Sequence, residues 1–147
     1  MSPDVFGLVL GAVFIVPTLY FVRHKSWDQV AWPLFLVTLP VYYMLFGLLA
    51  GDSKLVLLEL VYGLPFVVLG MVCFRLRGIW MVYLLAFGWL AHGVYDYAHD
   101  QLFVNPGVFS WYPSFCALID VLVAVYLVVQ GRTILQERDI VSVSRLS

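Results

Sequence analysis

Charged residues and cysteines are scarce in this sequence. Charged residues make up 12% of the 147 residues, eight basic against nine acidic, and the formal net charge at pH 7 is −1. The basic residues are scattered rather than gathered into a patch, so nucleic acid is excluded as a partner. Cys73 ends one apolar run and Cys116 begins another, which places the two thiols near opposite membrane faces and predicts no intrachain disulfide.

Apolar residues are abundant instead, at 63% of the chain, with a mean hydropathy of +0.97. A composition of this kind is typical of integral membrane proteins. Apolar runs close to the length of a membrane span occupy 5–22, 30–50, 55–74, 79–98 and 114–130. We therefore predict an all-α bundle of five transmembrane helices, in a single domain over residues 1–147. Residues 131–147 are expected to form a short, frayed tail.

The distribution of lysine and arginine predicts the orientation of the helices. Basic residues in short loops are retained on the cytoplasmic side of a membrane. Lys54 would lie alone on one side of the membrane. The other seven basic residues would lie on the opposite side: Arg23, Lys25, Arg75, Arg77, Arg132, Arg138 and Arg145. The amino terminus is therefore expected outside and the carboxyl terminus in the cytoplasm, in a bacterial inner membrane. Trp27, Trp32 and Trp80 are expected in an aromatic belt at the inner interface.

Prolines are expected to open space within this bundle. Pro17, Pro40 and Pro65 lie inside predicted helices, where each removes a backbone donor and bends the helix. We expect a polar cavity among the last three helices, facing the outer side. The segment 105–107, Asn-Pro-Gly, has the residues of a tight turn and is expected to fold back over that cavity as a lid.

The ionisable residues of the predicted helices form the candidate site. His92, Asp96 and His99 follow one another at i, i+4 and i+7, so they share one stripe of their helix. Asp120 lies four residues after Cys116 in the last run, and Glu59 lies near the outer end of the third. All fall in the outer halves of their helices. Because a carboxylate facing lipid costs about 2.5 to 3.5 kcal/mol, these groups are expected to face one another, water or a ligand.

Two imidazoles and up to three carboxylates match the ligand preferences of Zn, Mn or Fe. The leading hypothesis makes His92, Asp96, His99 and Asp120 metal ligands. Glu59 and Asp96 are the candidate catalytic residues, with Glu59 orienting a ligand or acting as a general base. A metal at this depth would suit an enzyme that acts on a lipid-soluble substrate.

Several alternatives remain open at this point. The same residues could form a hydrogen-bonded network that fixes helix register. They could also act without metal, as the acid and base of an isomerase or cyclase of a polyene lipid, or one histidine could ligate a haem or pigment. A different class altogether is a non-catalytic subunit of a larger complex, packed against a protein partner or another copy of itself. Cys116 is either a soft ligand or a packing residue.

The segment from Trp89 to Leu127 carries a more specific pattern. It contains H-x3-D-x2-H at His92, Asp96 and His99, then Asn-Pro at 105–106, and C-x3-D at Cys116 and Asp120. This segment, about the last third of the chain, resembles an uncharacterised family of small bacterial and fungal multi-pass membrane proteins. The resemblance implies that the His and Asp positions belong together, and it implies no activity. The chain departs from that pattern at Asp100, where a further histidine is expected.

Overall fold

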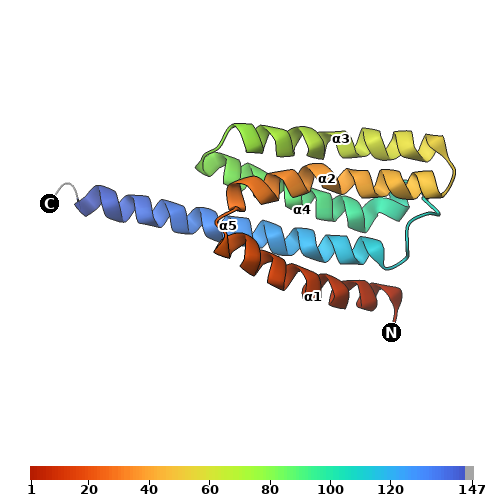
Figure 1. Ribbon diagram of the computed structural model, residues 1–147, viewed down its shortest axis with the longest axis horizontal. Coiled ribbons are helices and arrows are strands. Elements are labelled where there is room, and N and C mark those ends of the chain that lie inside the picture. The colour runs from red at the N-terminus through yellow and green to blue at the C-terminus, as the bar shows by residue number, and fades with distance from the viewer. Residues whose placement is uncertain (145–147) are drawn as a thin grey trace.

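The computed structural model describes residues 1–144, apart from the side chains of 138, 139 and 141–144. The regular elements of these residues are the helices α1 (Pro3–His24), α2 (Asp28–Leu49), α3 (Ser53–Arg75), α4 (Ile79–Leu102) and α5 (Tyr112–Ser144). Short turns join the first four helices, and a longer loop joins α4 to α5 (Figure 1). The predicted all-helical bundle is confirmed.

Four of these helices, α1, α2, α3 and the first 26 residues of α5, are long and apolar enough to cross a membrane. Large apolar side chains cover their outward faces, as on Val13, Leu48 and Val125. A surface of this kind suits a lipid bilayer, so the chain is an integral membrane protein. The helix α4 is equally long, with 24 residues, but the polar residues of its second half keep it out of this group. Its crossing and the orientation of the termini stay predictions.

All five helices begin or end slightly outside the predicted runs, and two extend past them by more than two residues. The helix α4 continues to Leu102 and therefore includes His99, and α5 continues to Ser144 rather than ending at Gln130. Residues 131–144, for which the sequence predicts a frayed tail, are helical, and 145–147 lie outside the described residues. The reason is that polar side chains end an apolar run without ending a helix, since most of them have adequate helix propensity.

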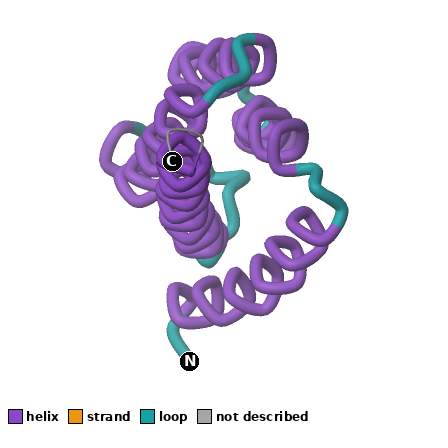
Figure 2. Tube along the Cα trace, turned by 90° about the vertical axis from the view of Figure 1, so that its left-hand side faces the viewer, coloured by secondary structure: helices purple, strands orange, loops and turns teal. Residues whose placement is uncertain are grey.

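The helices form two antiparallel pairs, α2 with α3 and α4 with α5, and α1 lies along α5 at the rim of the bundle (Figures 1 and 2). Two glycines one turn apart bring α1 close to the start of α5. A Cβ atom on Gly7 would lie 2.2 Å from the carbonyl oxygen of Trp111, and one on Gly11 would lie 3.0 Å from that of Phe115. Such small residues let helix backbones approach in a membrane. By contrast, α1 touches α2 only sparsely.

Tryptophans occupy the apolar core between the pairs. Trp32 of α2 and Trp89 of α4 are buried and meet edge to face, with ring centroids 6.0 Å apart. The indole nitrogen of Trp89 donates to the carbonyl oxygen of Trp32, at 3.2 Å. Trp32 therefore lies in the core and not in the aromatic belt predicted for it, whereas Trp27 and Trp80 are exposed as expected. The burial of Trp32 is possible because its own N–H also has a partner, Asp28 at 3.3 Å.

Candidate metal centre

Three buried side chains meet between α4 and α5. His92 and Asp96 lie one turn apart on α4, and Asp120 faces them from α5. The Nδ1 atom of His92 is 2.7 Å from Asp120 Oδ2 and 3.3 Å from Asp96 Oδ2. Their exposed fractions are 1%, 0% and 0%, and one potential ligand atom from each lies within 4.8 Å of the others. These three residues are called the triad below.

A glycine makes this meeting possible. A Cβ atom on Gly93, next to His92, would lie 3.0 Å from the Cβ of Asp120 and 3.4 Å from the carbonyl oxygen of Ala117. Any side chain at position 93 would therefore push α5 away from α4. The close approach of the two backbones brings a carboxylate of α5 within hydrogen-bonding distance of an imidazole on α4.

The triad has more polar atoms than it can pair. Among the described residues, five buried side-chain atoms have no hydrogen-bond partner, and four belong to the triad: His92 Nε2, Asp96 Oδ1, Asp96 Oδ2 and Asp120 Oδ1. The fifth is the hydroxyl of Tyr43. Unpaired buried polar atoms are costly, and two ionised carboxylates beside one imidazole leave the triad negative even if the imidazole is protonated. The arrangement therefore calls for a cation or for additional protons.

Glu59 and His99 belong to a second network, in which their own polar side-chain atoms are paired. One oxygen of Glu59 accepts a hydrogen bond from the Tyr95 hydroxyl at 2.7 Å. The other lies 2.9 Å from His99 Nε2 and accepts from Asn105 Nδ2, also at 2.9 Å. Tyr43 stacks on the His99 ring, with centroids 4.5 Å apart. No polar atom of Glu59, His99 or Asn105 is among the unpaired buried atoms, so this network resembles structural support rather than a ligand site.

Three of the four predicted ligands thus converge, and the fourth does not. His99 shares a stripe with His92, but seven residues of helix separate the two imidazoles by about 10 Å along the axis. One metal ion cannot bridge that distance, since ligand bonds are about 2.0 to 2.2 Å long. Glu59, the predicted general base, faces His99 and not the triad.

Two residues of these networks carry no signal in the sequence. Tyr43 is one of nine tyrosines, and nothing in the spacing of α2 marks it. Asn105 was predicted only as part of a turn, yet its side chain binds Glu59 and the carbonyl oxygen of Tyr43. The segment 105–107 packs on the end of α2 and on Glu59. It was predicted as a lid over a polar cavity among α3, α4 and α5, but it covers the hydrogen-bonded Glu59–His99 network instead.

Two cavities flank the triad. A polar vestibule of about 400 Å³ is lined by Asp96 together with Asp4, Asp100, Ser110 and Ser114, at the end of the bundle that holds the amino terminus. It lies between α1, α4 and α5, whereas the sequence predicts a polar cavity among α3, α4 and α5. The reason is that α3 closes its side with the Glu59 network, whereas α1 packs on α5 but, among the described residues, does not contact α4, which leaves room between α1 and α4. A second, apolar cavity of about 280 Å³ is lined by Asp120 and Cys116.

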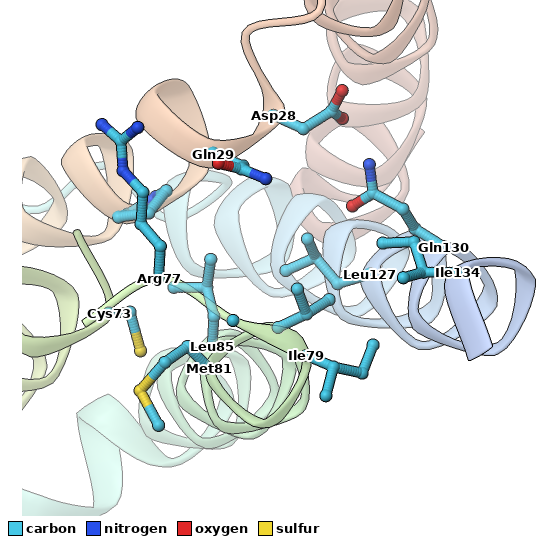
Figure 3. A pocket seen from close by; sticks show the side chains of 13 residues that line it. Asp28, Gln29, Cys73, Arg77, Ile79, Met81, Leu85, Leu127, Gln130 and Ile134 are labelled. Carbon is cyan, nitrogen blue, oxygen red and sulfur yellow. The ribbon is translucent and has the colours of Figure 1, made fainter. Parts of the chain in front are cut away.

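A third pocket, of about 110 Å³, lies at the opposite end of the bundle (Figure 3). Asp28 and Gln130 line one side, and Arg77 and Cys73 line another. The carboxylate of Asp28 is well paired, since it accepts hydrogen bonds from the Trp32 indole and the Tyr126 hydroxyl. Asp28 lies between the predicted apolar runs 5–22 and 30–50, yet its side chain is buried. Buried ionisable groups are therefore present at both ends of the bundle, and among the described residues the unpaired carboxylate and imidazole atoms all belong to the triad.

The resemblance over the segment from Trp89 to Leu127 implied that its His and Asp positions belong together. Within that segment, the structure joins His92, Asp96 and Asp120 and separates His99 from them. Membership of the uncharacterised family stays a prediction. Comparison of the chain with protein-family models, with curated proteins and with solved structures finds no match.

Proposed function

We propose that this membrane protein binds a divalent transition metal ion, Zn, Mn or Fe, through His92, Asp96 and Asp120. The observation that carries the proposal is the set of four unpaired, fully buried ligand atoms on these three residues. One nitrogen and two carboxylates are donors that these metals accept. A cation held by the imidazole and one oxygen of each carboxylate would offset the negative charge of the triad and would give Asp96 Oδ2 a partner.

The spacing of the triad supports this proposal. Ligand atoms about 2.0 to 2.1 Å from a tetrahedral ion lie about 3.3 to 3.4 Å from one another. His92 Nδ1 and Asp96 Oδ2 are already 3.3 Å apart. His92 Nδ1 and Asp120 Oδ2, at 2.7 Å, are joined by a proton that the metal would replace, so this distance would open by about 0.6 Å. Three protein ligands leave a further position open, as at catalytic metal sites.

The vestibule beside Asp96 supplies an access route for a cation. Asp4, Asp100 and Asp96 line it, and it lies next to the exposed end of α4. A cleft lined by carboxylates concentrates cations and speeds their arrival. Ions would reach the triad through Asp96, without crossing the apolar core.

We further infer that α4 crosses the membrane with the other four helices, in a bacterial inner membrane, with the amino terminus outside. The basic residues Arg23, Lys25, Arg75 and Arg77 support this orientation, because the alternation of helices brings them to one end of the bundle. The triad would then lie in the outer half of the bilayer. Cysteines introduced singly at Asp4 and Asp52, and labelled from outside intact cells, test this orientation. Labelling at neither position would contradict it.

Elemental analysis of the detergent-purified protein tests the metal site. The expected result is close to one Zn, Mn or Fe per chain in the wild type. His92→Gln and Asp120→Asn should abolish this content, because each near-isosteric change removes one ligand and keeps the packing. His99→Gln is the matched control, since it makes the same change on the same helix outside the triad, and it should retain the metal.

Two results would overturn the proposal. A wild-type protein that contains no metal, and that acquires none on dialysis against Zn, Mn or Fe salts, would leave the triad as a protonated acid–base group or a structural network. Equal loss in His99→Gln and His92→Gln would show that metal content follows the integrity of the bundle rather than the three ligands.

A further inference from the structure

The apolar cavity beside Asp120 lies where α1 and α2 diverge. Its wall is made by residues of α1, α2 and α5, together with Trp89 of α4. Because α1 packs on α5 and touches α2 only sparsely, the gap between α1 and α2 opens sideways, toward the region where the apolar faces of the bundle meet lipid. A cavity with this placement is reached from the bilayer and not from water.

The lining of the cavity changes from exposed at the mouth to buried at the bottom. Phe14 of α1 and Phe35 of α2 stand at the mouth, with exposed fractions of 56% and 42%. Ile15, Trp32 and Trp89 form the bottom and are at most 2% exposed. The cavity therefore runs inward from the lipid-facing surface to the core of the bundle.

Besides Tyr42, Tyr112 and Cys116, the wall of the cavity offers few polar groups. The hydroxyls of Thr18 and Thr38, which line the cavity, donate to the carbonyl oxygens of Phe14 and Phe35 within their own helices, both at 2.8 Å. Their methyl groups are left to the cavity. No lysine, arginine or histidine lines it. The bottom differs, because Asp120 lines the cavity there and its Oδ1 atom has no partner.

We propose that this cavity binds one long-chain or isoprenoid alcohol from the bilayer, with its hydroxyl directed to Asp120. The inference rests on the proposed metal site, whose open position the same hydroxyl would reach. At about 30 Å³ for each small group, the cavity holds a stretch of about nine or ten carbon atoms, and a longer chain extends through the mouth into lipid.

The charge of the site selects the alcohol over other amphiphiles. Asp120 is the one carboxylate that lines the cavity, and no basic side chain lines it to pair with a phosphate or a fatty acid. With a divalent ion bound, the carboxylates of the triad already balance its charge, so an anionic head group would add a buried negative charge that nothing compensates. An alkane would fill the apolar part and leave Asp120 Oδ1 unpaired. A neutral hydroxyl donates to that oxygen, and its own oxygen is a ligand for a metal ion.

Fluorescence quenching tests the proposal, because Trp32 and Trp89 line the cavity. The protein used for this measurement carries Trp27→Phe, Trp80→Phe and Trp111→Phe, so that Trp32 and Trp89 are the remaining indoles. The probes are 10-bromodecan-1-ol, 10-bromodecanoic acid and 1-bromodecane, added to protein in detergent. The alcohol should quench the remaining fluorescence with a saturable component, and the acid should show none. The bromoalkane should bind about tenfold more weakly, because it makes no hydrogen bond to a charged acceptor.

A pair of variants on α1 locates the binding site. Thr18→Phe places a ring in the cavity and should weaken saturable quenching by the alcohol about tenfold or more, since it displaces two or more methylene groups. Val13→Phe, at a position 67% exposed outside the cavity, adds a similar bulk and should leave binding unchanged. Both variants should keep their metal, because neither residue belongs to the triad.

The outcomes separate this inference from the metal proposal. Metal present without saturable alcohol quenching would overturn the inference alone. Saturable quenching that Thr18→Phe abolishes, in a protein without metal, would support the cavity and overturn the metal site. Equal binding of the bromo-acid and the bromo-alcohol would contradict the assignment of Asp120 as the group that selects the ligand.

Discussion

The Nδ1 atom of His92 lies 2.7 Å from Asp120 Oδ2, although 28 residues separate the two along the chain. The contact fixes the register of α4 against α5 at a depth where neither residue reaches solvent. It joins the one imidazole of the triad to the carboxylate that also lines the apolar cavity. The bond therefore links the candidate metal centre to a route from the bilayer.

Removal of the metal should destabilise the protein. A ligand that binds only the folded state at about a hundredfold above its Kd stabilises it by about 2.7 kcal/mol. Dialysis against a chelator should therefore lower the melting temperature by several degrees, and return of the metal should restore it. Differential scanning fluorimetry gives the measurement. Asp120→Asn should be insensitive to the chelator, and an equal response in that variant would contradict the assignment.

A side chain at position 93 should disrupt the triad although the three ligand residues themselves are unchanged. Gly93→Val adds atoms where even a Cβ would meet Asp120 Cβ at 3.0 Å, so α5 must move away from α4. Metal content should fall sharply, as measured by elemental analysis. The control is Val94→Leu on the neighbouring exposed position, which should keep its metal. A metal-replete Gly93→Val protein would show that the site does not depend on this close approach.

The Glu59 network should prove structural. Glu59→Leu leaves His99 and Asn105 without their shared acceptor and should cost about 3 to 5 kcal/mol of stability, as loss of one partner of a buried pair does. Glu59→Gln should cost less, because the amide oxygen still accepts a hydrogen bond. Thermal denaturation measures both. Metal content should persist in Glu59→Gln, and its loss there would support the ligand-orienting role predicted for Glu59 from the sequence.

The acidic vestibule should control how fast a metal ion arrives. Asp4→Asn with Asp100→Asn removes two of the charges that line it and leaves the three ligands in place. The rate of metal uptake by the metal-free protein should fall and lose most of its dependence on ionic strength. Stopped-flow uptake at low and high salt gives the comparison. An unchanged rate would mean that cations reach the triad by another route.

Much of the fold could be predicted from the sequence, because the bilayer imposes a simple rule. A run of about 20 apolar residues must be helical to satisfy its own backbone in lipid, and hydropathy reads such runs directly. Hydropathy does not detect a helix that lacks a long apolar run, and it does not show which side chains pack together. It missed the last 14 described residues of α5, which mix polar and apolar residues and are still helical. It also placed Trp32 at an interface, because hydropathy does not show that Asp28 and Trp89 enclose this side chain.

Part of the candidate site could also be predicted from the sequence, because helix geometry and the cost of burying charge in lipid constrain it. The i, i+4 spacing by itself determined that His92 and Asp96 share one face of a helix, and the cost of charge in lipid determined that Asp120 must find partners. Only the tertiary structure decided which partners meet. The close approach at Gly93, the hydrogen bonds of Asn105 to Glu59 and the divergence of α1 from α2 depend on packing between segments far apart in the chain. Helical periodicity fixes the direction in which each side chain points from its own helix. The distance between two helices is set by the side chains of both helices, and these come from separate parts of the sequence.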